Sequence, residues 1–156
     1  MNGSGGPNRS PRPLILHVED DANDLFLVKH AFGKAAPQAF IVPVTDGREA
    51  QAYLAGEGPY ADRARHPLPD FVLLDLKLPR MGGLEVLEWM KSVPALAGLP
   101  AFILSSSSEK SDVDHARALG ASGYHTKQGS VRAMVETLRE IVTSLPPPPP
   151  PTAGDV

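Results

Sequence analysis

The stretch Phe71-Val72-Leu73-Leu74-Asp75 places four apolar residues directly before one carboxylate. Pro69 precedes this run and Pro79 follows it, so the run is short and clearly bounded. A short, continuously apolar run predicts a strand that is buried on both faces, as in the middle of a parallel sheet. Asp75 then lies at the carboxyl end of the strand, where open α/β sheets bind their ligands, although an Asp also commonly begins a turn.

Length and composition limit the class of protein. The chain has 156 residues, which fits one domain with a sizeable core. The net charge of −3 gives no global sign of binding to nucleic acid or to an anionic membrane surface. The absence of cysteine excludes disulfides and thiolate metal sites. No apolar run is long enough to span a bilayer and no signal peptide begins the chain, so we expect a cytoplasmic protein.

The two ends differ from the middle in composition. Residues 1–13 are rich in Gly, Pro, Asn and Ser without periodicity, which predicts a disordered leader. Residues 146–156 begin with six consecutive prolines, which predicts a polyproline II tail. This tail is either a stiff spacer or a segment that docks into a groove or onto a second subunit. One folded domain is expected between the ends, over residues 14–145.

Within that domain, apolar runs alternate with stretches of helical periodicity. Strands are predicted at residues 14–18, 40–44, 71–74, 101–104 and 123–126. Helices are predicted at residues 22–35, 48–54 and 84–90, from the serine run 105–108 to about 119, and at 130–145. Asp46 is expected to cap the second helix, and one serine of the run 105–108 is expected to cap the fourth.

Five strands that alternate with five helices predict right-handed crossovers and a parallel sheet with helices on both faces. We therefore expect a flavodoxin-like, doubly wound α/β fold with strand order 2-1-3-4-5. Pro43 fits an edge position for the second strand. In this order the first and third strands flank the switch point, so their carboxyl ends meet in one crevice.

That crevice would collect the polar residues that end the strands. These residues are Glu19, Asp20, Asp21, Asp75, Ser105, Ser106 and Lys127. Clustered carboxylates repel one another unless a cation neutralises them, and oxygen ligands without His or Cys favour Mg²⁺. A lysine and a hydroxyl add hydrogen-bond donors for an anion. The combination favours phosphoryl transfer in which a carboxylate attacks phosphorus in line.

These motifs resemble the receiver domain of two-component response regulators. The matching stretches are Val18-Glu19-Asp20-Asp21, the segment 73–83 (Leu-Leu-Asp-Leu-Lys-Leu-Pro-Arg-Met-Gly-Gly), Ile103-Leu104-Ser105-Ser106 and the segment 120–127 (Gly-Ala-Ser-Gly-Tyr-His-Thr-Lys). They occur in order at the ends of the strands, and the resemblance covers about residues 14–145. The long loop around residues 58–60 and the segment 78–81 are most similar to single-domain regulators that partner bacterial phytochromes.

The resemblance implies a role for each matching residue of the reaction site. Asp75 matches the phosphoacceptor, which takes its phosphoryl group from a histidine kinase. Lys127 matches the lysine that pairs with this aspartate and then with the phosphoryl group. Asp20 matches the direct Mg²⁺ ligand, Glu19 the neighbour that acts through water, and Lys77 the residue whose backbone carbonyl completes the metal shell. Asp21 lies beside them, and we do not expect it to be a ligand.

The resemblance also implies a switch. Ser105 matches the hydroxyl that moves onto the phosphoryl group, with Ser106 as the rival position. Tyr124 matches the aromatic residue whose rotamer reports activation. The face built from the fourth helix, the strand at 123–126 and the helix at 130–145 is the family's usual dimer surface, so we expect a homodimer there. The family usually has Pro where Gln128 stands; because a cis non-proline bond costs about 3 kcal/mol, the Lys127–Gln128 bond is expected to be trans.

Two other interpretations remain open. A phosphatase of the haloacid dehalogenase type also attacks through a strand-end aspartate, but it needs a second aspartate where Lys77 stands. A pseudo-receiver would only bind a partner, which the filled acidic and lysine positions disfavour. No helix-turn-helix pattern indicates DNA binding and we expect no output domain after residue 145, so an unknown downstream protein is the expected target. We expect a phosphoryl acceptor that catalyses its own phosphorylation and dephosphorylation, and not an enzyme with a separate substrate.

Overall fold

The computed structural model describes residues 13–145, so residues 1–12 of the predicted leader and the predicted tail at 146–156 lie outside it. Five parallel strands form one sheet in the order β2-β1-β3-β4-β5. The strands are β1 (Leu14–Val18), β2 (Phe40–Val44), β3 (Phe71–Leu74), β4 (Ala101–Ser105) and β5 (Gly123–Thr126). This is the predicted flavodoxin-like topology, with β2 and its Pro43 at the edge.

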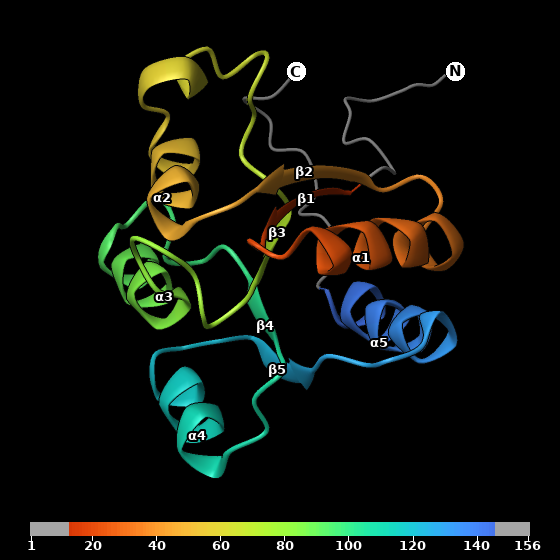
Figure 1. The fold of residues 1–156 in the computed structure, drawn as a ribbon. Coiled ribbons are helices and arrows are strands. Elements are labelled where there is room, and N and C mark those ends of the chain that lie inside the picture. The colour runs from red at the N-terminus through yellow and green to blue at the C-terminus, as the bar shows by residue number, and fades with distance from the viewer. Residues whose placement is uncertain (1–12, 146–156) are drawn as a thin grey trace.

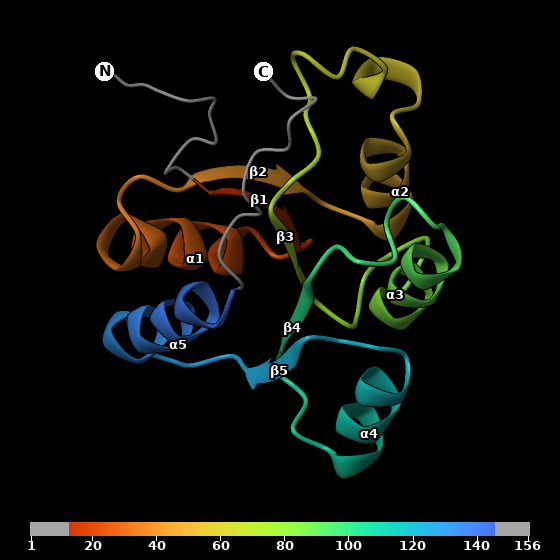
Figure 2. The same ribbon diagram turned by 180° about the vertical axis from the view of Figure 1, so that it is seen from behind.

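The helices cover both faces of the sheet. Figures 1 and 2 show α1 (Ala22–Ala35) and α5 (Val131–Ser144) side by side on one face. The other face carries α2 (Gly47–Ala55), α3 (Gly83–Ser92) and α4 (Lys110–Ala118). Successive residues of β3 pack on opposite faces of the sheet. Leu74 belongs to the hydrophobic cluster under α2 and α3, and Leu73 to the cluster under α1 and α5. All four residues of β3 are fully buried, as the sequence predicts.

The long connection between α2 and β3 is anchored as a surface loop and includes the short 3-10 turn η1 (Gly58–Tyr60). The guanidinium of Arg63 donates hydrogen bonds to the carbonyl oxygens of Tyr53 (2.8 Å) and Leu54 (2.6 Å) at the end of α2. Carbonyls in the last turn of a helix lack the full set of partners within the helix, so Arg63 supplies donors for them and fixes the loop to α2.

Side-chain caps define where several of the helices begin. Asp46 caps α2, as predicted, by accepting a hydrogen bond from the Glu49 amide, and Asp21 caps α1 in the same manner. The predicted serine cap of α4 is wrong: Glu109 is the N-cap residue and makes no side-chain cap bond. Ser107 instead binds the carboxylate of Asp112 (2.5 Å), which keeps the serine run in the loop before the helix.

No helix within residues 13–145 is both long enough and apolar enough to span a membrane.

Candidate functional site

Backbone hydrogen bonds extend the sheet by one residue beyond its strands. The amide of Asp75 donates to the carbonyl of Val18 (3.1 Å), and the amide of Lys127 donates to the carbonyl of Ser105 (2.8 Å). The amide of Glu19 likewise donates to a carbonyl at the end of β2, at 3.0 Å. Because the carboxyl ends of parallel strands lie on the same side of the sheet, these bonds hold Glu19, Asp75 and Lys127 at the predicted crevice.

Three carboxylates converge in this crevice. Glu19 and Asp75 are buried, with 1% and 7% of their surface exposed, and Asp20 is exposed beside them. One oxygen from each lies within 4.8 Å of the others. Two buried carboxylates so close together repel unless cations compensate them, and hard oxygen ligands suit a divalent ion such as Mg²⁺. The donor set therefore fits the predicted metal.

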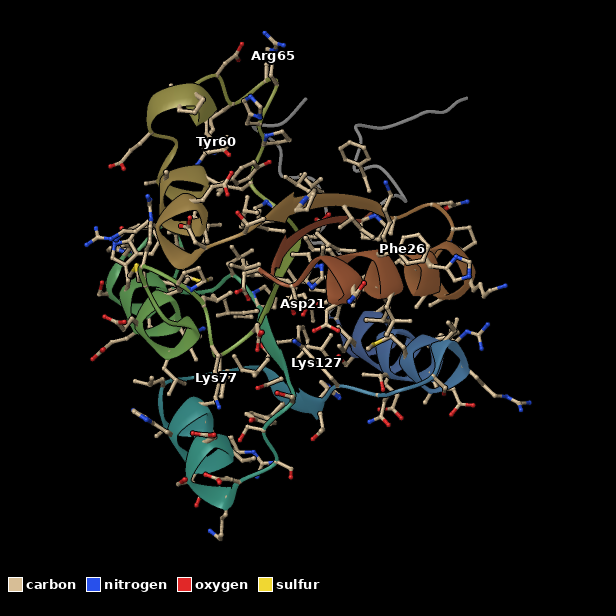
Figure 3. The ribbon with its side chains drawn as sticks, in the orientation of Figure 1. Asp21, Phe26, Tyr60, Arg65, Lys77 and Lys127 are labelled. Carbon is tan, nitrogen blue, oxygen red and sulfur yellow. The ribbon has the colours of Figure 1, made fainter. Side chains whose placement is uncertain are left out.

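The ammonium group of Lys127 supplies one positive charge to this group of carboxylates. Its Nζ atom lies 2.8 Å from Glu19 Oε1, 3.1 Å from Asp75 Oδ2 and 2.7 Å from Asp24 Oδ2. Figure 3 shows Lys127 at the end of β5, on the side where Asp21 marks the start of α1. The contact with Asp24 is absent from the sequence prediction. Asp24 and Lys127 are 103 positions apart, and an acidic residue in the first turn of a helix is common without such a contact.

The electrostatics of the site follow from burial and from these ion pairs. Burial raises the pKa of Glu19 to about 7, against the lowering effect of the hydrogen bond from Lys127. Burial alone would lower the pKa of Lys127, but its hydrogen bonds to Asp24 and Glu19 outweigh burial and raise that pKa above the ordinary lysine value. Lys127 therefore keeps its positive charge. This one charge does not fully compensate the buried Glu19 carboxylate, so a further cation near Glu19 is favourable.

The backbone around Asp75 is tightly constrained. Asp75 Oδ1 accepts a hydrogen bond from the Leu76 amide (2.7 Å), and the Gly83 amide donates to the Leu76 carbonyl (2.9 Å). A Cβ atom at Gly83 would lie only 2.0 Å from the carbonyl oxygen of Asp75, so only glycine fits there. The start of α3 is thus seated directly against the end of β3.

A chain of hydrogen bonds connects Ser105 with Tyr124. Ser105 is the last residue of β4 and is buried, and its Oγ accepts a hydrogen bond from the Ser107 amide (3.2 Å). The Tyr124 hydroxyl, half-buried on β5, donates to the Ser107 carbonyl (2.7 Å). The rival Ser106 is exposed. Both predicted switch residues therefore meet at Ser107, which the sequence prediction did not single out.

The remaining predicted residues lie around this core. Lys77 is exposed in the loop after β3 and points toward α4 in Figure 3. It borders a polar pocket of about 350 Å³ that is lined also by Ser106, Ser107, Ser108, Glu109 and Asp112. Asp21 caps α1 and is not part of the carboxylate group. The Lys127–Gln128 bond is trans, as predicted, since no peptide bond in residues 13–145 is cis.

Comparison with known proteins assigns this geometry to a family. Residues 15–139 match the family model described as the response regulator receiver domain. The response regulator Rcp1 of Synechocystis sp. is 31% identical over 132 residues, which cover 85% of this chain and 88% of that protein.

Solved structures show the same likeness. The phosphorylated cyanobacterial phytochrome response regulator RcpA superposes with a TM-score of 0.78 at 35% identity, covering 86% of this chain and 94% of that one. The Mn²⁺-bound form of response regulator Rcp1 gives a TM-score of 0.76 at 30% identity, covering 90% of this chain and 99% of that one. The bacteriophytochrome response regulator RtBRR gives a TM-score of 0.73 at 34% identity, covering 92% of this chain and 86% of that one.

Proposed function

The chain belongs to the family of response regulator receiver domains, and on that premise we propose that it accepts a phosphoryl group on Asp75 from a histidine kinase. The observation that carries this proposal is the position of Asp75. Its buried carboxylate lies at the carboxyl end of the central strand β3, 3.1 Å from Lys127 and within 4.8 Å of the carboxylates of Glu19 and Asp20. A nucleophilic carboxylate between a fixed cation and a cation-binding group is the arrangement that phosphoryl transfer requires.

In the proposed reaction, a carboxylate oxygen of Asp75 attacks the phosphorus of a phosphohistidine. The new O–P bond forms as the N–P bond breaks, and the histidine nitrogen leaves with the electron pair and takes up a proton. Lys127 stabilises the charge on the phosphoryl oxygens, and the Leu76 amide holds Asp75 Oδ1 in place. Water later attacks the same phosphorus and releases phosphate, so the chain resets itself without a separate substrate.

We propose Mg²⁺ as the divalent ion of this site. Asp20 would bind it directly, Asp75 would share it, Glu19 would act through water, and the backbone carbonyl of Lys77 would complete the protein ligands. The support is the all-oxygen carboxylate group and the Mn²⁺-bound form of the related Rcp1. A bound ion would supply positive charge near the transferred group.

The proposed switch uses Ser105 and Tyr124. New phosphoryl oxygens on Asp75 would be charged acceptors for the Ser105 hydroxyl, so that hydroxyl would turn toward them. Ser105 would then release the Ser107 amide, and the loop that Tyr124 holds would be free to rearrange. The face formed by α4, β5 and α5 would change as a result. We propose that this face carries a homodimer and a downstream protein partner.

We propose that the phosphoryl donor is a phytochrome-type histidine kinase and that the transfer takes place in the cytoplasm. This finer proposal is supported by the similarity to RcpA and RtBRR, whose names state a phytochrome or bacteriophytochrome connection. Mixing the chain with phosphorylated phytochrome kinases and with unrelated histidine kinases would test it by comparing transfer rates. Equal transfer from all kinases would remove the support for a phytochrome partner.

Intact-mass spectrometry tests the central proposal. After incubation with acetyl phosphate and Mg²⁺, the wild type should gain one phosphoryl group that is stable in acid and removed by hydroxylamine. Asp75→Asn should gain none, whereas the matched variant Asp62→Asn, in an exposed loop, should behave like the wild type. An adduct that persists in Asp75→Asn would contradict the assignment. No adduct, together with no beryllofluoride binding, would favour a module that only binds a partner.

A further inference from the structure

Lys127 lies between the proposed phosphorylation site and one carboxylate outside it. Two of its partners, Glu19 and Asp75, belong to the group of three carboxylates that would bind the cation. The third partner, Asp24, is the third residue of α1 and is not in that group. Its Oδ2 atom is nevertheless nearest to the lysine nitrogen, at 2.7 Å against 2.8 Å and 3.1 Å.

The lysine has no spare donor in this arrangement. An ammonium group carries three N–H bonds, and each carboxylate partner of Lys127 occupies one of them. A phosphoryl oxygen on Asp75 must therefore displace one of these acceptors to receive a hydrogen bond from Lys127. A divalent cation would compensate the charges of Glu19 and Asp75 and weaken their hold on the lysine. Asp24 would keep its full charge and remain the main competitor.

Asp24 is well placed to compete. Its backbone amide donates to Oδ1 of the capping residue Asp21 at 2.9 Å, which fixes the first turn of α1. A carboxylate in the first turn of a helix also interacts favourably with the helix dipole. The two side chains are partly shielded, with 30% of Asp24 and 14% of Lys127 exposed, so water screens their attraction less than at an open surface.

We propose that Asp24 is a positioning residue that holds Lys127 toward α1 in the unphosphorylated state and opposes its movement onto the phosphoryl group. This inference rests on the function proposed above. Asp24 thereby sets how readily the phosphorylated state forms. It also connects that state to the first turn of α1, because the ion pair with Asp24 weakens when Lys127 moves.

Beryllofluoride, which mimics a phosphoryl group on an aspartate, provides the test. Its affinity for the full chain is measured by fluorine NMR at saturating Mg²⁺, together with the rate of phosphorylation by acetyl phosphate. Asp24→Asn keeps the shape but loses the charge, so we expect about three- to tenfold tighter beryllofluoride binding, as loss of one partly shielded ion pair implies. Asp24→Glu keeps the carboxylate and should return the affinity toward the wild-type value.

Asp21→Asn is the matched control, because it removes one charge from the same turn and asparagine caps a helix as well as aspartate does. Its affinity should stay within about twofold of the wild type, because the Asp21 carboxylate is exposed and is not among the ion-pair partners of Lys127. An equal gain in Asp24→Asn and Asp21→Asn, or weaker binding in Asp24→Asn, would overturn the inference while the proposed function stood. A wild type that binds no beryllofluoride and gains no phosphoryl group would instead overturn the proposed function, and the inference with it.

Discussion

The two sides of the crevice are held by different kinds of interaction. On the side of β1, β3 and β5, the buried carboxylates of Glu19 and Asp75 are joined to Lys127 by ion pairs of 2.8 and 3.1 Å. Their backbones are fixed by extensions of the sheet ladders. On the side of the β4–α4 loop, Ser106 and Ser108 are exposed, and the hydrogen bonds that hold the loop converge on Ser107, which bonds to Ser105, Asp112 and Tyr124.

This difference separates two tasks of the proposed function. Chemistry on Asp75 requires groups that stay in position, since small displacements of reacting groups slow a reaction strongly. A response to that chemistry requires a segment with two arrangements of similar free energy, and weakly held loops supply such segments. The ion-paired side therefore suits the reaction, and the serine loop suits the response.

The largest expected effect comes from removing the shared cation of the ion-paired side. Lys127→Met leaves Glu19, Asp24 and Asp75 without their common partner. We expect the free energy of unfolding to fall by about 3 to 5 kcal/mol without divalent ions, as for other broken buried ion pairs. Mg²⁺ should restore part of this loss. Urea unfolding with EDTA and with Mg²⁺ measures both; a variant as stable as the wild type in EDTA would show that this side is not held by charge.

The next effect is a pH dependence that originates in Glu19. Its pKa is about 7 in the folded chain against 4.5 for an unperturbed glutamate carboxyl, so the folded state binds more protons between these values. Stability should therefore fall as pH rises from 4.5 to 7, by up to about 3 kcal/mol, and change no further above 7. Glu19→Gln should lack this component. The free energies of unfolding of the wild type and of Glu19→Gln are measured in EDTA at intervals from pH 4.5 to above 7. A difference between the two chains that does not change with pH would contradict the predicted loss of stability.

Sequence patterns predicted the fold because its determinants are local. The apolar run before Asp75, the Pro43 at the edge strand and the cap at Asp46 each act within a few residues. The topology then brings the strand ends together, so the positions of Glu19, Asp20, Asp75 and Lys127 followed from the order of the strands alone.

Two features depended on side-chain contacts that no local pattern encodes. The ion pair between Asp24 and Lys127 joins α1 to the end of β5. Its formation depends on how far one lysine side chain reaches across the carboxyl ends of the strands. The serine run has the composition of a helix cap, yet Ser107 bonds to Asp112 in the first turn of α4, and Glu109 is the N-cap residue. Competition among four adjacent serines for a few nearby partners cannot be decided from their order in the chain.

On the responsive side, Ser105→Ala should have a smaller effect on stability. It removes one buried hydroxyl and its bond to the Ser107 amide, which lowers the free energy of unfolding by about 1 kcal/mol. The phosphoryl adduct on Asp75 should still form, but the NMR shifts of the β4–α4 loop should no longer respond to beryllofluoride. The exposed Ser106→Ala is the control and should keep that response. A full loop response in Ser105→Ala would assign the switch to another residue.

The smallest effect is expected from Tyr124→Phe, which removes only the hydroxyl bonded to the Ser107 carbonyl at 2.7 Å. The net loss of stability should be about 0.5 to 1 kcal/mol, the usual worth of one such bond. Because this bond is one of the few that hold the loop, amide hydrogen exchange at Ser107 and its neighbours should become faster, while exchange at Asp75 stays unchanged.

Tyr60→Phe offers a matched comparison, since the Tyr60 hydroxyl also donates one hydrogen bond, to Glu49 at 2.8 Å, far from this loop in the sequence. It should leave the exchange of Ser107 as in the wild type. If Tyr124→Phe accelerated exchange equally at Asp75 and at Ser107, the two sides of the crevice would open as one unit. The separation between a fixed reaction side and a weakly held response side would then be wrong, because a loop that cannot move without the phosphoacceptor cannot report its state independently.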